Sequence, residues 1–345
     1  MQCMRKGKKV DSPLAKSMTT IEKVRRLYEV VGTKDQLAIL INADPDALAS
    51  AMALKRLFWR RIKKAEIYRI NKVDRADNIT MIRLLNIQNK HIRKIKKSQF
   101  TKWALLDSQP HHNEAYSSFH FDIIIDHHPM TNDLSAEFID IRDGYGANTT
   151  ILTEYLKSAK IKPSPRLATA MFYGIKTDTN NFIRNSVSAD MIAFRYLYDY
   201  TNLNIIKKIE SSEITTKTLS EIAVAIENLS VCKQTAFVHM ETVDNPDTLV
   251  IIADFFIKLA EVTWSICSGV YEDKLIVCIR NAGFRRNAGK FVHDSFGNIG
   301  TAGGHTNMAR AEIPLQNIKK AQKQNSVDLR QFVQTQLVRK VWSKV

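Results

Sequence analysis

The first half of the chain carries three short, continuous apolar runs, each of which ends in polar or acidic residues. They are Gln36–Asn42, Trp103–Asp107 and Phe121–Asp126. Apolar runs of this length are typical of strands that are buried on both faces, as in a parallel sheet. We therefore expect the three runs to be strands of one sheet.

A helical pattern separates the first two runs. Asp46–Lys64 places small and apolar residues on one side and ends in basic residues, which suit the negative end of a helix dipole. Strands that alternate with helices predict an α/β domain built on a parallel, doubly wound sheet. Ligands of such sheets bind beyond the carboxyl ends of the strands, so the residues that follow the runs are the first candidates for a site.

The pattern changes after about residue 200. Leu203–Asn228 is polar and charged with helical spacing, and we expect one connecting helix over 201–229. Thr235–Met240 and Trp264–Asn281 are β-rich, with a hairpin turn at Glu272–Asp273. The expected organisation is a basic tail over 1–20, a first domain over 21–200, the connecting helix, and a smaller mixed α+β domain over 230–345.

Most of the charge imbalance lies in the first third of the chain. The 345 residues contain 51 Lys and Arg against 35 Asp and Glu, a formal net charge of +16. Residues 1–102 hold 25 of the basic and 9 of the acidic residues, so the remainder is neutral. This basic third suits an anionic partner such as single-stranded nucleic acid. The alternative is a solvated helix face with a basic tail.

Other compositional features exclude several classes of protein. The chain has no stretch of about 18 uncharged apolar residues, which a membrane span needs, and its N-terminus lacks the apolar core of an export signal. Four cysteines (Cys3, Cys232, Cys267 and Cys278) show no zinc-ligand spacing and are expected to be reduced thiols. We expect a cytoplasmic protein without a membrane partner, and a homodimer stays open.

Acidic and imidazole side chains follow the predicted strands. They are Asp44 and Asp46, Asp107, the run Asp126–His127–His128, and later Asp178 in GIKTDTNNF. Each one alone is commonly a helix cap or a turn residue. Gathered at one sheet edge, however, the carboxylates would repel one another, and bound divalent cations resolve that repulsion. Oxygen ligands with one or two imidazoles suit manganese or magnesium, and a pair of such ions can activate water against a phosphoryl group.

The same residues resemble a known family. NADPDALAS, LLDSQP, IIDHHP and GIKTDTNNF are similar, in this order, to motifs I to IV of the DHH phosphoesterase superfamily, and AGGHTNMA resembles the glycine-histidine motif of the DHH-associated C-terminal domain. The resemblance covers roughly residues 36 to 310. It implies a two-domain hydrolase with two manganese ions in the cleft between the domains, most similar to the group of nanoRNases and pAp phosphatases.

The resemblance also implies a role for each motif residue. Asp44 would bind the first metal and Asp46 the second, with Asp107 bridging the two and His127 and Asp178 completing the ligands of the second metal. Asp126 would orient His127, and His128 would face the scissile phosphate. In the C-terminal domain, Gly303, Gly304 and His305 would grip the nucleotide, and Arg280 would clamp a phosphate, with Arg285 and Arg286 as alternatives.

One position departs from the family pattern. Many members carry a metal-binding histidine four residues before the first motif I aspartate, and here that residue is Leu40; Asn42 offers only a weak, neutral oxygen. The leading hypothesis is therefore a manganese-dependent phosphoesterase of short oligonucleotides or pAp whose first metal is weak. The alternatives are a 5′ single-strand exonuclease of the RecJ type, a cyclic-dinucleotide phosphodiesterase, and a non-catalytic protein that binds nucleotides or nucleic acid.

Overall fold

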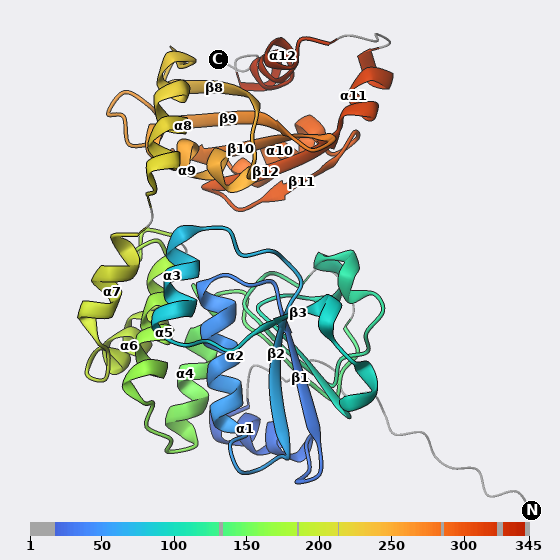
Figure 1. The fold of residues 1–345 in the computed structure, drawn as a ribbon, viewed down its shortest axis with the longest axis vertical. Helices are drawn as coiled ribbons and strands as arrows, with labels where there is room; N and C mark the ends of the chain where they lie inside the picture. Colours follow the sequence, from blue (N-terminus) through green and yellow to red (C-terminus); the bar gives the residue numbers. More distant parts are fainter. Residues whose placement is uncertain are drawn as a thin grey trace, which may run out of the picture. The chain divides into compact units, whose positions relative to one another are not determined.

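The computed structural model describes residues 18–130, 134–184, 186–212, 214–283, 286–322 and 327–341. The chain forms two compact units that divide between residues 213 and 214, and each is described here by itself (Figure 1). Most of the expected basic tail lies outside the described residues, as do Cys3 and Arg285. No helix within the described ranges combines the length and the apolar character needed to cross a membrane.

The first unit is built on a six-stranded parallel sheet with the order β3-β2-β1-β4-β5-β6. Its strands are β1 (Gln36–Ile41), β2 (Lys64–Arg69), β3 (Lys90–His91), β4 (Lys102–Leu106), β5 (Ile123–Asp126) and β6 (Phe138–Ile141). The α/β prediction is confirmed, and the three predicted strands are β1, β4 and β5. Because the chain leaves β1 towards β2 on one side and returns to β4 on the other, the switch point of the sheet lies between β1 and β4.

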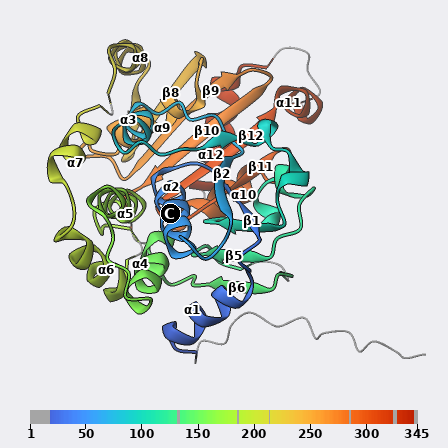
Figure 2. The same cartoon turned by 60° about the horizontal axis from the view of Figure 1, so that its bottom comes forward.

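The two faces of this sheet are covered differently (Figures 1 and 2). One face packs against α-helices, and alternate residues of β1 such as Leu37 and Ile39 lie in that core. These helices are α1 (Thr20–Glu29), α2 (Pro45–Leu57), α3 (Ala76–Leu84), α4 (Asn148–Ser158), α5 (Pro165–Asp178), α6 (Ser188–Tyr198) and α7 (Leu203–Glu210). The other face, which includes Ala38 and Leu40, packs against residues 92–100 and 110–121, two segments that contain short 3-10 turns on either side of β4.

The helix expected over Asp46–Lys64 is shorter than predicted. It ends at Leu57, Arg60 adopts a left-handed φ of 63°, and the basic residues that follow lead into β2. The sequence did not indicate β2 because its run KAEIYR begins with exposed and half-buried charged residues and lacks the continuous apolar pattern of a central strand. The short strands β3 and β6 were missed as well.

The second unit contains a mixed six-stranded sheet with the order β11-β12-β10-β9-β8-β7. Its strands are β7 (Ser230–Cys232), β8 (Thr235–Thr242), β9 (Trp264–Tyr271), β10 (Lys274–Asn281), β11 (Thr301–Gly304) and β12 (Met308–Pro314). Only β8 and β9 are parallel neighbours among these described strands. The predicted hairpin joins β9 to β10 through Glu272, whose φ is 54°. A second, mixed α and β unit is therefore confirmed.

Helices cover both faces of the second sheet. The helices α8 (Thr216–Glu227) and α9 (Pro246–Phe256) contribute to one core, and α10 (Ala288–Phe296), α11 (Leu315–Gln322) and α12 (Leu329–Val341) contribute to the other. The single connecting helix predicted over 201–229 is wrong. Two helices, α7 and α8, occupy this range, and the break between them at Ser211 and Ser212 coincides with the division between the units.

Candidate metal centre

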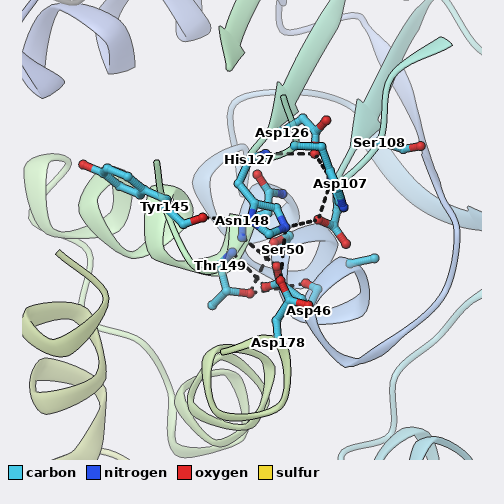
Figure 3. A network of polar contacts seen from close by, with 12 residues as sticks. Asp46, Ser50, Asp107, Ser108, Asp126, His127, Tyr145, Asn148, Thr149 and Asp178 are labelled. Carbon is cyan, nitrogen blue, oxygen red and sulfur yellow. Dashed lines mark hydrogen bonds and ion pairs between the residues drawn. The ribbon is translucent and has the colours of Figure 1, made fainter. Parts of the chain in front are cut away.

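The predicted acidic residues of the first unit converge at the switch point of its sheet (Figure 3). Asp44 and Asp46 follow β1, Asp107 follows the neighbouring strand β4, and Asp126 is the last residue of β5. Because β1 and β4 are adjacent parallel strands, their carboxyl ends open at the same edge. The fifth carboxylate, Asp178, reaches this edge from the last turn of α5.

Asp46 is held by the start of another helix. Its carboxylate accepts the backbone N–H groups of Asn148 at 2.6 Å and of Thr149 at 2.8 Å, the first two residues of α4. The positive end of a helix dipole favours a carboxylate there, and the fully buried side chain is fixed in one orientation. A direct contact between helices brings Asp178 close. A Cβ on Gly174 of α5 would lie 3.2 Å from the Cα of Asp46, so the two helices approach more closely here than a larger residue would normally allow.

His127 lies at the centre of the group. Its Nδ1 lies 3.0 Å from the backbone carbonyl of Tyr145, and its Nε2 lies 3.2 Å from Asp107 Oδ1 and 3.1 Å from Asp178 Oδ2. A ring that donates Nδ1–H to a carbonyl presents Nε2 to a metal, which is the usual arrangement of a histidine ligand. We call Asp46, Asp107, His127 and Asp178 the metal-site cluster.

Asp107 occupies an unusual backbone conformation. Its φ is 55°, a left-handed value that aspartate tolerates better than most residues. The Oδ1 atom is buried and accepts no well-aligned hydrogen bond from the residues that the structure describes, although His127 lies beside it. A strained backbone and an unsatisfied carboxylate oxygen at the same residue are typical of a functional site.

The electrostatics of the cluster favour a cation. Burial raises the pKa of Asp44 to about 7, with Asp178 and Asp46 adding repulsion, and burial together with Asp178 raises the pKa of Asp46 to about 6. Burial and the neighbouring Asp46 and Asp44 hold the pKa of Asp107 well above its ordinary value. Burial lowers the pKa of His127, but the contacts with Asp107 and Asp178 outweigh it and hold that pKa well above the usual range.

The donor atoms fit a divalent metal ion. Ligand atoms of Asp46, His127 and Asp178 lie within 4.8 Å of one another, and so do those of Asp107, Asp126, His127 and His128. Carboxylate oxygens with imidazole nitrogens suit manganese or magnesium. Asp44 is not a member of either group, and its Oδ1 caps α2 by accepting the N–H of Ala47 at 2.8 Å.

Asp126 holds a different histidine from the one predicted. Its Oδ1 accepts the backbone N–H of His127, but the ring that it contacts is that of His128, whose Nδ1 lies 2.8 Å away. The expectation that Asp126 orients the His127 ring is therefore wrong. Burial lowers the pKa of His128, but Asp126 and Asp107 outweigh it and raise that pKa to about 9. The exposed His112 has its ring edge-on to His128 with the centroids 5.6 Å apart.

Two buried amides of the site were missed by the sequence reasoning. Gln109 is fully buried and donates from Nε2 to Asp126 Oδ2 at 2.8 Å and to the carbonyl of His128 at 3.1 Å. Asn148 is also fully buried, and neither atom of its side-chain amide has a partner among the described residues. Figure 3 shows Asn148 beside His127. Asn148 is the first residue of α4, and a polar residue at the start of a helix does not stand out in the sequence.

Leu40 lies in the hydrophobic core. It is fully buried in the cluster on the non-helical face of the sheet, which also contains Tyr116 and Leu105. Burial raises the pKa of Tyr116, and the carboxylates of Asp107 and Asp44 raise it further. These carboxylates are therefore close to Tyr116, and the core that contains Leu40 adjoins the acidic edge. The position where many relatives place a histidine is thus filled by an apolar side chain.

The residues predicted in the second unit fall into two groups. Arg280 is buried in β10 and makes a two-pronged ion pair with Asp254 of α9 (Nε to Oδ1, 2.5 Å), so its guanidinium is already committed to holding helix and sheet together. Arg286, its alternative, is half-buried in the loop before α10. Gly303 and Gly304 end β11 and, like His305, are exposed.

The backbone of this glycine-histidine loop is tightly held. The N–H of Gly289 in α10 donates to the carbonyl of His305, and the N–H of His305 donates to the carbonyl of Met308, both at 2.8 Å. A Cβ on Gly304, whose φ is 149°, would lie 2.4 Å from the Met308 oxygen. A Cβ on Gly303 would meet nothing within 4 Å, so space remains open beside it.

Comparison with known proteins finds a family similarity within the first unit. Residues 36–175 match the model of the DHH family, N-terminal domain. An uncharacterized protein of Methanocaldococcus jannaschii is 35% identical over 302 residues, which are 86% of this chain and 62% of that protein. The chain therefore spans less than two thirds of that relative's length.

Solved structures share the fold of this chain at low sequence identity. An exopolyphosphatase-related protein from Bacteroides fragilis has a TM-score of 0.72 and 14% identity over 94% of this chain and 98% of that one. RecJ from Thermus thermophilus, in complex with Mn²⁺, has a TM-score of 0.51 and 12% identity over 94% of this chain and 56% of that one. At these identities the similarity concerns the fold.

Proposed function

We propose that the first unit is a divalent-metal-dependent phosphoesterase that hydrolyses short oligonucleotides or pAp. The observation that carries the proposal is the metal-site cluster, in which Nε2 of one oriented histidine lies within 3.2 Å of two carboxylates. Burial and mutual repulsion outweigh the effect of His127 and His128 and raise the pKa values of Asp44, Asp46 and Asp107, whereas at Asp178 the histidines and Arg184 outweigh burial and lower the pKa. A divalent cation offsets the repulsion among these carboxylates.

The proposed ligands follow from the geometry. Asp46, His127 and Asp178 would hold one ion, Asp107 would contact it and a second one, and Asp44 would belong to the second, weaker site. Manganese is the proposed metal and magnesium the alternative. When bound, such ions stabilise charge on a phosphoryl group and lower the pKa of a water molecule.

His128 and Asp126 have a separate role in this proposal. A pKa of about 9 keeps the His128 ring protonated at neutral pH, and the carboxylate of Asp126 fixes its position. The imidazolium can donate a hydrogen bond to a phosphate oxygen, or a proton to the leaving oxygen, while Asp126 stabilises its charge. Both residues are therefore proposed to act on the phosphate.

Substrate recognition is assigned to the second unit. The exposed glycine-histidine loop offers backbone groups and open space at Gly303, which suits a nucleotide that approaches the chain closely. His305 is proposed to contact the same nucleotide. Arg280 is omitted from this proposal because its guanidinium is already paired with Asp254.

Two observations each favour an alternative function. The charge of +16 in residues 1–102 suits a longer single strand, as in an exonuclease of the RecJ type, and the RecJ structure of similar fold contains Mn²⁺. The apolar Leu40 favours a protein that binds nucleotides without hydrolysing them.

The deciding experiment is manganese-dependent hydrolysis of a 5′-phosphorylated dinucleotide, with pAp, a cyclic dinucleotide and a long single strand assayed alongside. The control is Asp107→Asn, which removes the charge and still tolerates the left-handed backbone of this position. Metal-dependent turnover of the short substrates that is lost in the control supports the proposal, and turnover of the long strand alone would favour the exonuclease. Absence of turnover with every substrate, despite measurable manganese binding, would contradict hydrolysis and favour the binding protein.

A further inference from the structure

The first unit has a cavity far from the metal-site cluster. It has a volume of about 270 Å³ and lies between the last turns of α2 and the first turn of α5. Because α2 begins and α5 ends at the metal-site cluster, the cavity lies at the opposite ends of the same two helices. The 13 residues of α2 span about 20 Å at 1.5 Å per residue. The cavity is therefore separate from the proposed active site.

The walls of this cavity combine an apolar floor with a basic rim. Ile67, Ile87 and Leu167 are buried and form the floor. Lys55, Arg56 and Arg166 stand around it, and no described side chain makes a hydrogen bond or an ion pair with any of these three cations. We call them the rim cations.

The surroundings of the rim cations do not neutralise them. The acidic residue that acts on Lys55, Glu66, is already bound by Lys64 at 2.8 Å and by Lys90 at 2.9 Å. Burial lowers the pKa of Lys55, and the neighbouring Arg166 lowers it further. The first turn of α5 adds the positive end of a helix dipole to the same wall. An anionic group is the missing partner.

An aromatic side chain completes the cavity. Trp59 lines it and leaves 64% of its surface exposed, which is unusual for so large an apolar ring. Proteins that bind single-stranded nucleic acid combine exposed aromatic rings with positively charged side chains, because bases stack on the rings and phosphates contact the cations. The volume is close to the lower end of the range of about 300–1,000 Å³ for small-molecule sites, so it suits one nucleoside unit of a strand.

We propose that this cavity is a binding site for single-stranded nucleic acid, in which a base stacks against Trp59 and the flanking phosphates contact Lys55, Arg56 and Arg166. Of the three rim cations, Lys55 and Arg56 belong to residues 1–102, the basic third of the sequence. The proposed site therefore gives a role to part of the excess positive charge. It requires neither metal nor hydrolysis, so it can be tested independently of the proposed activity.

The test measures binding of a labelled single strand to the full chain by fluorescence anisotropy, with EDTA present so that no hydrolysis occurs. The variants are Trp59→Ala, Trp59→Phe and the double variant Lys55→Ala/Arg166→Ala. The matched control is Arg25→Ala/Lys34→Ala, which removes one arginine and one lysine from exposed positions of the same unit. A second ligand is an abasic strand with the same number of phosphates.

Trp59→Ala should weaken binding of the normal strand at least about fivefold, Trp59→Phe should retain most of it, and neither should affect the abasic strand. The double variant should weaken both strands and lower the salt slope by about one to one and a half, whereas the control changes both much less. The proposal is overturned if the control weakens binding as much as the double variant, because the charge then acts generally. Equal binding of the two strands by every protein would overturn it as well.

Discussion

Two buried charged networks of the first unit both contain aspartate, and the pKa of that aspartate shifts in opposite directions. In the metal-site cluster, burial and neighbouring carboxylates raise the pKa of Asp46 to about 6. In the second network, Asp140 is equally buried, but Arg142 and Lys23 outweigh the burial and lower its pKa. Lys23 Nζ lies 2.7 Å from Asp140, and the nearer guanidinium nitrogen of Arg142 lies 2.9 Å away. We call Lys23, Asp140, Arg142 and Glu154 the paired network.

The difference separates a structural network from a functional one. Charges that are buried together with partners of opposite sign hold elements in place, here α1 against β6. Charges of the same sign that are buried together raise the free energy of the metal-free protein and point to a ligand. The two networks are joined at Tyr145, whose hydroxyl donates to Glu154 at 2.8 Å and whose carbonyl lies 3.0 Å from His127 Nδ1. The paired network thereby fixes the orientation of a proposed metal ligand.

The largest contrast is expected between Asp107→Asn and Asp140→Asn. Asp107→Asn should reduce hydrolysis at least about a thousandfold, because a cation bound there contributes several kcal/mol to the transition state. It should change the free energy of unfolding by less than about 1 kcal/mol, since it removes a charge that its neighbours repel. Asp140→Asn should instead lower that free energy by about 3–5 kcal/mol, because it removes the carboxylate that pairs with the buried Lys23 and leaves Arg142 with Glu154 alone.

Urea denaturation in EDTA and initial rates with saturating manganese measure the two quantities. Rates of Asp140→Asn are taken well below its melting temperature, where most of the activity should remain. If Asp107→Asn destabilised the metal-free protein as strongly as Asp140→Asn does, the distinction between the two networks would not hold.

Asn148→Ala tests whether the unpaired amide belongs to the metal site. Both polar atoms of the Asn148 amide lack partners among the described residues. Asn148 is the first residue of α4, and its backbone N–H donates to the carboxylate of Asp46. An amide that orients ligands or bound water typically affects metal affinity by about 10- to 100-fold. We expect a loss of that size in manganese affinity, measured by calorimetry, with little change in the stability of the metal-free protein.

Asn78→Ala is the matched control for Asn148→Ala. Asn78 is a second buried asparagine of the first unit, its Oδ1 is also without a partner, and it lies in α3 outside the metal-site cluster. Manganese affinity should be unchanged in this variant. Equal losses of affinity in the two variants would mean that Asn148 affects the metal only through the fold.

The sequence predicted the site better than it predicted the surroundings of the site. The apolar runs identified β1, β4 and β5, and the rule that ligands bind at the carboxyl ends of strands brought Asp46, Asp107 and His127 together. The sequence could not indicate β2, whose charged residues lie on a partly exposed strand. It also could not assign Asp126 to the ring of His128 or Arg280 to Asp254, because such pairings depend on three-dimensional distances.

The stabilisation of the protein by bound manganese should depend on pH. The reason is that carboxylates at the metal site have raised pKa values, whereas Asp140 of the paired network has a lowered one. The folded, metal-free protein retains protons on Asp44 and Asp46 up to about pH 7 and 6, whereas the unfolded chain releases them near pH 4. The free energy of unfolding therefore falls as the pH rises from about 4 to 7. Bound manganese replaces these protons, so its stabilising effect should be greater at about pH 8 than at about pH 5.

The expected difference is on the order of 2 kcal/mol, or about 4–8 °C in melting temperature, measured by thermal unfolding with manganese or EDTA at each pH. Asp140 has a lowered pKa, so the stability that it contributes is lost only in acid, below this pH range. An Asp46→Asn variant should lose part of the pH-dependent metal effect, because Asp44 retains its own raised pKa. An equal effect of manganese at both pH values would argue against displacement of protons from the cluster.

The smallest expected effect concerns Leu40→His, which restores the residue that many relatives have at this position. Leu40 shares its core with Tyr116, whose raised pKa reflects burial and then the nearby Asp107 and Asp44. An imidazole at position 40 should therefore be able to reach the weaker metal and tighten manganese binding a few-fold. The polar ring should also cost about 1–3 kcal/mol in the metal-free protein. Leu40→Gln, equally polar but a poor metal ligand, should show the cost without the gain; tighter binding in both variants would mean that relaxed packing, not a new ligand, causes it.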